Sequence, residues 1–250
     1  MKILALYNFK GGVGKTSTAV HLAYLAARRG ARTLLWDLDP QGAASYLYRV
    51  EGREKGLMKK LIEGEKELAE LVRESDFRRL ALVPADLSFR KFDLTLAAAR
   101  RPAERFARLL RPLLADFDLL VLDCPPSLSL LAETLFSLSD ALVVPLLPSP
   151  LSLRALEQIA QHLAKKGLAD VAVLPFLSMV DRRKSLHRDP DWLEARSPYP
   201  LLGAQIPYSS AVEETTVRRQ PLFEHAPTSP AARAYEQLWE EVEAKLAREG

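Results

Sequence analysis

The segment Tyr7-Asn8-Phe9-Lys10-Gly11-Gly12-Val13-Gly14-Lys15-Thr16-Ser17-Thr18 lies between a short apolar run and the start of a helical pattern. Its three glycines can adopt backbone angles that are closed to other residues, so successive N–H groups can turn inward around phosphate oxygens. Lys15 adds a positive charge for the outer phosphates, and Thr16 offers a hydroxyl to a magnesium ion. The positive end of the following helix faces the same anion. The segment therefore predicts a loop that binds a triphosphate.

A second lysine distinguishes this loop from the usual phosphate-binding pattern. The position that normally holds the first glycine is Phe9, and Lys10 follows it. Residues 10–16 together match the deviant Walker A signature, and here the chain resembles the ParA/MinD family of dimerising ATPases. The alternative is a glycine-rich turn that binds nothing. The position of the match, between a predicted strand and a predicted helix, argues against that alternative.

Composition sets broad limits on the class of protein. At 250 residues the chain can bury a sizeable core, and its net charge of +3 is too small to make it basic overall. Local clusters of arginine can still form a surface for nucleic acid. The single cysteine, Cys124, excludes an internal disulfide and fits a reducing cytosol. We see no export signal and no apolar run close to the roughly 20 residues that span a bilayer, so we expect a cytoplasmic protein.

Apolar runs alternate with helix-length segments along the whole sequence. Runs typical of buried strands occupy residues 1–7, 33–36, 80–84, 119–123, 141–145, 171–177 and 202–206. Helical tendency or spacing occupies residues 15–29, 45–80, 100–114, 152–166 and 231–248. Such alternation predicts an α/β fold: a doubly wound, mostly parallel sheet flanked by helices, as in P-loop NTPases, in a single domain over residues 1–250.

Carboxylates follow two of these predicted strands. Asp123 ends an apolar run in a Walker B arrangement, and we expect it to hold magnesium through a bound water, with Thr16 as a direct ligand. Asp37 and Asp39 would point in opposite directions if both lay on a strand. If the chain leaves the strand near Asp37, Asp39 can lean over the γ-phosphate. The alternative is that both aspartates only cap the turn before Pro40.

The resemblance implies a role for several of these residues. It implies that Asp39 positions the attacking water and that Asp37 lies near the magnesium ion. It also implies that Lys10 reaches across a dimer interface to the partner's phosphates, so that two ATP molecules lie between facing subunits and hydrolysis separates the pair. Finally, it implies that Met179 and Pro207 frame the adenine ring.

The expected site can be stated by residue. We expect catalytic roles for Lys10, Lys15 and Asp39, and magnesium contacts from Thr16, Asp37 and Asp123. The expected nucleotide-binding residues are Lys10, Gly11, Gly12, Val13, Gly14, Lys15, Thr16, Ser17, Met179 and Pro207, with Lys15 on the β- and γ-phosphates and Ser17 on the α-phosphate.

The resemblance covers essentially the whole chain, with two departures. Residues 37–42, 123–127 and 225–230 also look like ParA-type partition ATPases. Cys124 stands where small or hydroxyl residues are commoner, and residues 208–211 lack the basic side chains expected there. The second departure puts part of any DNA surface in doubt.

The resemblance implies non-specific DNA binding, which needs lysine or arginine on phosphates. Two clusters can supply them, and each is equally well explained as solvated loop charge: Arg182, Arg183, Lys184 and Arg188 in one, Arg218 and Arg219 in the other. Relatives such as MinD that cycle on membranes carry a basic amphipathic tail, whereas the last helix here is rich in glutamate. We therefore expect no membrane partner.

Three functions remain open at this point. The main hypothesis is a magnesium-dependent ATPase that dimerises around ATP, binds duplex DNA and partitions a DNA cargo with a ParB-like adaptor, which would place it on the nucleoid. The second is a related ATPase that positions or regulates a protein assembly without touching DNA. The third is a metabolic enzyme that phosphorylates or amidates a small molecule, for which we find no second substrate pocket in the sequence.

Overall fold

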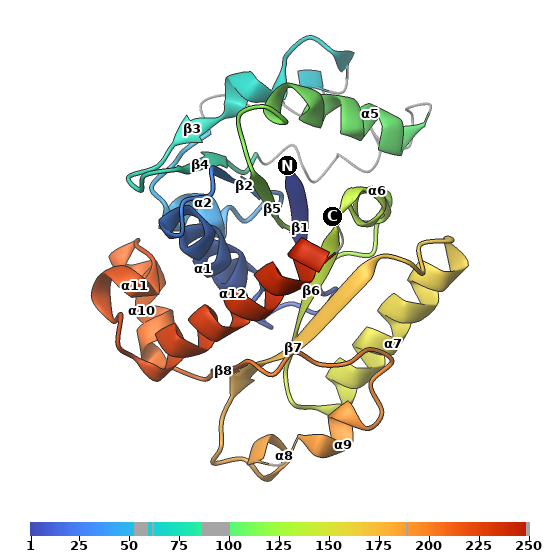
Figure 1. Ribbon diagram of the computed structural model, residues 1–250, viewed down its shortest axis with the longest axis vertical. Coiled ribbons are helices and arrows are strands. Elements are labelled where there is room, and N and C mark those ends of the chain that lie inside the picture. Colours follow the sequence, from blue (N-terminus) through green and yellow to red (C-terminus); the bar gives the residue numbers. More distant parts are fainter. Residues whose placement is uncertain (53–59, 62, 87–100, 189, 249–250) are drawn as a thin grey trace.

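The strands of the described residues form one sheet in the computed structural model (Figure 1), in the order β3-β4-β2-β5-β1-β6-β7-β8. The structure describes residues 1–250 apart from 53–59, 62, 87–100, 189 and 249–250. Among the described strands only β3 runs antiparallel to its neighbour. The predicted mostly parallel sheet is confirmed. The strands are β1 Lys2–Leu6, β2 Thr33–Asp37, β3 Arg73–Glu74, β4 Leu80–Val83, β5 Leu119–Asp123, β6 Ala141–Leu146, β7 Ala172–Val180 and β8 Gln205–Pro207.

Helices cover both faces of the sheet, which is why the central strands are apolar on both sides. Along β1, Leu4 and Leu6 pack into one core, whereas Ala5 and the following Tyr7 pack into the other. The helices are α1 Lys15–Arg28, α2 Ala43–Leu47, α5 Pro102–Leu110, α6 Leu130–Leu138, α7 Pro150–Lys165, α8 Ser185–Arg188, α9 Asp191–Glu194, α10 Ser210–Arg218, α11 Leu222–His225 and α12 Pro230–Arg248, with 3-10 turns η1 Leu68–Leu71 and η3 Arg111–Leu113.

The two faces carry different sets of helices. Residues of α1, α2, α11 and α12 join the core that contains Leu4 and Leu6, and α10 packs against it. Residues of α5, α6, α7 and α9 join the opposite core. Figure 1 shows α1 beside α12 on one side of the sheet, with α6 and α7 on the other. Because β1 lies inside the sheet, the loop that follows it emerges between two layers of helices.

The last helix packs on the sheet, as its apolar spacing predicted. Tyr235, Leu238 and Val242 are buried, while Glu240 and Glu243 point outward and bind Arg29 at 2.8 and 3.0 Å. Within the described ranges, no helix combines the length and the apolar composition needed to cross a bilayer.

Sequence patterns missed several short elements. The helical tendency over residues 45–80 gives α2, η1 and then β3, which pairs antiparallel with β4, while residues 53–59 and 62 lie outside the described part. The helices α6 and α10 were not predicted, and the strand expected at 202–206 spans Gln205–Pro207. Expected strands 119–123 and 141–145 appear with the same start residues.

A buried histidine joins α1 to the last helices. The His21 ring lies 2.6 Å from the Ser17 carbonyl through Nδ1 and accepts the Leu222 N–H at Nε2, at 3.1 Å. It also stacks on Tyr235, with 4.4 Å between ring centroids. A ring that donates through one nitrogen and accepts through the other is the neutral tautomer. Burial accordingly lowers the pKa of His21 to about 4.

From the buried, neutral His21 we predict that the free energy of unfolding decreases in acid. Because the folded pKa is about 4 and the ordinary value is 6.5, its contribution is fully present above about pH 6.5 and is lost as the pH falls toward 4. The full difference is about 3 kcal/mol. Urea unfolding of the wild type should show this extra loss, whereas His21→Gln, which keeps an acceptor for Leu222 and cannot titrate, should have a flatter pH dependence. Parallel curves for the two proteins would contradict the assignment.

Candidate nucleotide-binding site

The glycine-rich loop leaves the carboxyl end of β1, a central strand, and leads directly into α1. Gly12 and Gly14 take positive φ angles of 69° and 94°, which side chains rarely adopt. A Cβ on Gly14 would also lie 2.9 Å from the Ser178 hydroxyl. The requirement for glycine here comes both from the turn and from the close approach of β7.

Asn8 anchors the loop to the sheet, a role that sequence reasoning missed. Its side chain is fully buried; the amide donates to the Pro145 carbonyl on β6 at 3.0 Å, and its oxygen accepts the Lys10 N–H at 2.9 Å. A buried polar residue normally has its hydrogen bonds satisfied in this way. The only signal in the sequence is a polar residue at the end of a buried strand.

The two lysines of the loop have different surroundings. Lys15 is 7% exposed, and its ammonium donates to the Lys10 carbonyl at 3.1 Å. Burial lowers the pKa of Lys15, while Asp123 and Asp39 oppose that shift. The Lys10 side chain is half-buried, and no carboxylate of the described residues pairs with it. The charge of Lys15 is thus fixed over the loop, whereas that of Lys10 is uncommitted.

Two carboxylates meet at the ends of neighbouring strands. Asp37 on β2 lies directly beside Asp123 on β5 in the strand register. Asp37 accepts the Ser45 N–H and hydroxyl at 2.8 and 2.7 Å and the Asp39 N–H at 3.3 Å. Burial raises the pKa of Asp37 to about 6, partly offset by these bonds. Its oxygens are already occupied, which suits a position near a metal ion better than direct coordination.

Asp123 is the unsatisfied group of the site. Both carboxylate oxygens are buried, and neither has a partner at hydrogen-bond geometry among the described residues, although the Thr16 hydroxyl lies close enough to act on the carboxylate as a donor. Burial and then the charge of Asp37 raise its pKa well above the ordinary value, while the neighbouring Thr16 and Lys15 act in the opposite direction. A carboxylate in this setting fits Mg²⁺, which takes one or two carboxylates together with hydroxyl, water and phosphate oxygens.

No set of three or more His, Cys, Asp or Glu side chains within the described residues is arranged to hold a metal by itself. Magnesium sites that share phosphate oxygens need no such set. Cys124, next to Asp123, is fully buried and burial raises its pKa, so it is a packed thiol behind the site.

Asp39 lies beyond the end of β2. From the sequence, Asp39 can reach the γ-phosphate if the chain leaves the strand near Asp37. β2 ends at Asp37, and Asp39 is half-buried, with one carboxylate oxygen accepting the Gln41 N–H at 2.9 Å. It is close enough to Lys15 and Asp123 to influence the pKa of both. The structure therefore brings Asp39 to the mouth of the loop, and also gives it the turn-capping bond that the alternative required.

Met179 and Pro207 lie together at the edge of the same site. Pro207 on β8 is in register with Val180 on β7, beside an irregularity in the pairing. Met179 takes a positive φ of 54°, rare for a non-glycine residue, and its methyl group would lie 3.7 Å from a Cβ on Gly14. Thr16 and Ser17 occupy the first turn of α1 and are half-buried.

The two basic clusters are far from equivalent. Arg183 binds Asp181 through two bonds of 2.8 and 2.9 Å, whereas the neighbouring cations are exposed and have no acidic partner among the described residues: Arg182, Lys184 and Arg188. Figure 1 places α8, which follows Lys184 and ends at Arg188, apart from α10, which ends at Arg218. The structure does not bring the two clusters together within one chain.

The second cluster is bound within the protein. Arg218 pairs with Glu214 at 3.0 Å. Arg219 donates to the Tyr46 carbonyl at 2.8 Å, and its guanidinium lies 4.4 Å from the centre of the Tyr46 ring. Contacts from α10 to α2 were not visible in the sequence, and they leave these arginines less available for phosphate.

Known proteins are similar to this chain in sequence and in fold. A family profile described as an AAA domain matches residues 1–168. The chromosome-partitioning ATPase Soj of Thermus thermophilus is 36% identical over 253 residues, covering 97% of this chain and 96% of that protein.

Two solved structures extend the comparison. The septum site-determining protein MinD of Pyrococcus horikoshii, complexed with Mg-ADP, has a TM-score of 0.80 at 23% identity and covers 100% of this chain and 98% of its own. Cobyrinic acid a,c-diamide synthase of Mycobacterium smegmatis, with bound ADP and magnesium, has a TM-score of 0.79 at 24% identity over 97% and 94% of the two chains. At these identities the structural likeness is one of fold.

Proposed function

Because this chain belongs to the ParA/Soj/MinD family of P-loop ATPases, we propose that it hydrolyses ATP with magnesium and uses the bound nucleotide to control its own dimerisation and its binding to DNA. The observation that carries the proposal is the buried carboxylate of Asp123, which lies beside Thr16 and Lys15 and has no partner at hydrogen-bond geometry among the described residues. The related Soj is by name a chromosome-partitioning ATPase, and the MinD relative holds Mg-ADP.

The residues divide the work of phosphoryl transfer. The loop amides and Lys15 hold the β- and γ-phosphates, with Ser17 at the α-phosphate and Met179 and Pro207 at the adenine ring. Thr16 and Asp123 would hold the magnesium ion, with Asp37 behind them; when bound, magnesium neutralises charge on the phosphates. Such transfer needs positioning and charge more than covalent chemistry. Asp39 then orients the attacking water.

Lys10 supplies the dimeric part of the proposal. Its carbonyl accepts a hydrogen bond from Lys15 of its own chain, while its ammonium has no partner among the described residues. A dimer with two ATP molecules between facing subunits gives this ammonium a partner phosphate. Hydrolysis removes that phosphate and separates the subunits.

A DNA cargo with a ParB-like adaptor is the function these features support best, and it would place this cytoplasmic ATPase on the nucleoid. Arg182, Lys184 and Arg188 are exposed and have no acidic partner in the part of the chain that the structure describes, and they are the proposed phosphate contacts. Arg183, Arg218 and Arg219 contribute less, because each is held by a partner in its own chain.

Retention on unrelated duplex DNA tests this function. We expect binding with ATP or a slowly hydrolysed analogue and not with ADP. These three cations in each of two subunits should make six phosphate contacts, so affinity should fall roughly 10³-fold between about 50 and 200 mM salt. Joint replacement of Arg182, Lys184 and Arg188 by alanine should abolish retention.

Arg219→Ala is the matched control, because its guanidinium is already bound to Tyr46. It should cost much less than the triple replacement. No ATP-dependent retention even at low salt would reject the DNA function and favour the second hypothesis, an ATPase that positions a protein assembly.

A further inference from the structure

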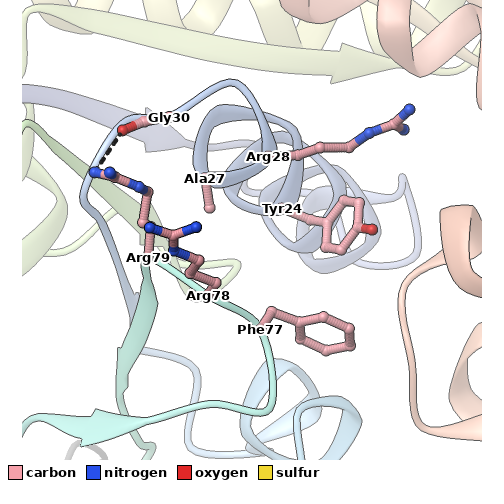
Figure 2. A pocket seen from close by; sticks show the side chains of 7 residues that line it. All are labelled: Tyr24, Ala27, Arg28, Gly30, Phe77, Arg78 and Arg79. Atoms are coloured by element: carbon pink, nitrogen blue, oxygen red, sulfur yellow. Dashed lines mark hydrogen bonds between the residues drawn. The ribbon is translucent and has the colours of Figure 1, made fainter.

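A cavity lies at the opposite end of α1 from the phosphate-binding loop. It has a volume of about 270 Å³, and Figure 2 shows its lining from α1 and from the turn that precedes β4. Since α1 contains 14 residues, the two ends of the helix are roughly 20 Å apart. This cavity is therefore separate from the nucleotide site described above.

Arg79 forms one wall and is held in place by the backbone. It follows Phe77 and Arg78 in a tight turn closed by the Leu80 N–H and the Phe77 carbonyl at 3.2 Å, and its φ is +65°. Glycine is the residue that such a turn position favours. One guanidinium nitrogen donates to the Gly30 carbonyl at 3.1 Å, which fixes the group and leaves its other donors for the cavity.

Arg78 supplies a second positive charge. Its side chain is exposed and makes no hydrogen bond or ion pair with any described residue. In Figure 2 the guanidinium groups of Arg78 and Arg79 lie on the same side of the cavity, near Ala27 and Gly30. Arg28 is different, because its guanidinium turns away and pairs with Glu236 at 3.6 Å. Two like charges therefore share one side of the cavity, and neither has an acidic partner in the part of the chain that the structure describes.

The opposite side of the cavity is aromatic. Tyr24 and Phe77 meet edge to face, with ring centroids 5.4 Å apart. Tyr24 is held from behind by a stacked Phe223 and by a hydrogen bond to Glu224, and Phe77 by Tyr48. Neighbouring side chains thus fix both rings, and a flat apolar group can lie against them.

We propose that this cavity binds a nucleoside monophosphate, with its phosphate on Arg78 and Arg79 and its base against Tyr24 and Phe77. Arginine suits phosphate because its planar fork offers several donors, and every base can stack on an aromatic ring. The volume of about 270 Å³ is just below the usual range for ligand pockets, so the cavity suits a ligand no larger than a single nucleotide. That nucleotide can be free or the 5′-phosphorylated end of a single strand.

Calorimetric titration of the full chain tests the proposal with the phosphate-binding loop already filled by Mg-ADP. AMP should bind with one site per chain, and inorganic phosphate alone and adenosine alone should each bind more weakly. Arg79→Gly and Arg78→Gln should each weaken AMP binding roughly 10- to 100-fold, as expected for the loss of a charged hydrogen bond. Arg79→Gly relaxes the turn, so its thermal stability should be equal to or higher than that of the wild type.

Arg101→Gly is the matched control, since Arg101 also has a positive φ, of 56°, and lies before α5. It should leave AMP affinity unchanged. A 5′-phosphorylated oligonucleotide that binds more tightly than AMP, and depends on Arg79, would identify the strand end as the ligand; the reverse order would identify the free nucleotide. The proposal is overturned if AMP and the oligonucleotide both fail to bind at millimolar concentration, if both variants bind as the wild type does, or if phosphate alone binds as well as AMP.

Discussion

Asp39→Ala is expected to reduce ATP turnover by roughly 10²- to 10⁴-fold, the contribution of a group that orients or deprotonates a nucleophile. Nucleotide affinity should be nearly unchanged, because the proposed phosphate contacts are the loop amides and Lys15 and do not include Asp39. The ATP-bound dimer should then accumulate. Phosphate release assays give the turnover, and light scattering after gel filtration gives the oligomeric state.

Asp39→Asn separates water positioning from turn capping. Asparagine can keep the bond from the Gln41 N–H, at 2.9 Å in the structure, but it carries no negative charge. If Asp39 positions water, the asparagine variant should be as slow as the alanine variant. If Asp39 only caps the turn, asparagine should restore turnover, and the catalytic assignment would be wrong. Asp76→Ala, which removes a largely exposed carboxylate, controls for the change in charge.

Lys10→Ala should abolish the ATP-dependent dimer and lower turnover by roughly 10³-fold, the lower end of the effect of a cation supplied by a partner subunit. The nucleotide affinity of the monomer should change little. Lys15 donates a hydrogen bond to the backbone carbonyl of residue 10, and the alanine variant keeps that carbonyl. Turnover is measured in the otherwise wild-type chain, and the dimer is best measured in the Asp39→Ala background, where hydrolysis is too slow to separate the subunits.

Lys245→Ala on α12 is a suitable control for loss of one lysine. It should dimerise with ATP as the parent does. A Lys10→Ala protein that still forms the dimer would remove the role of Lys10 across the interface, while weak ATP binding by its monomer would show that the lysine serves its own nucleotide.

Local sequence was sufficient for the frame of the fold and for much of the site. β1 and β5 are continuous apolar runs, and the glycines with Lys15 must follow β1 for the loop to form. Asp123 was expected at the end of its strand and lies there. These features depend on residues that are neighbours in the chain, so a pattern alone can reveal them.

Features that depend on distant contacts were not accessible in this way. Asn8 reaches Pro145 across 137 positions, and Arg219 reaches Tyr46 across 173. β3 has only two residues and exists because β4 pairs with it. For the same reason, the sequence could not show that Arg218 and Arg219 are bound within the chain. Nor could it show the cavity lined by Tyr24 and Phe77, which are distant in the sequence.

The two outermost strands of the described sheet, β3 and β8, affect how copies of this chain can associate. β3 offers two residues, both charged, and β8 offers three, of which Pro207 has no N–H to donate. Such short, interrupted borders give an incoming strand few hydrogen bonds, and proteins use them to avoid fibrous aggregation. If the proposed DNA binding gathers many copies on one DNA molecule, these edges give them little means to polymerise edge to edge, and the proposed reversible pairing falls to the nucleotide-binding end of the sheet.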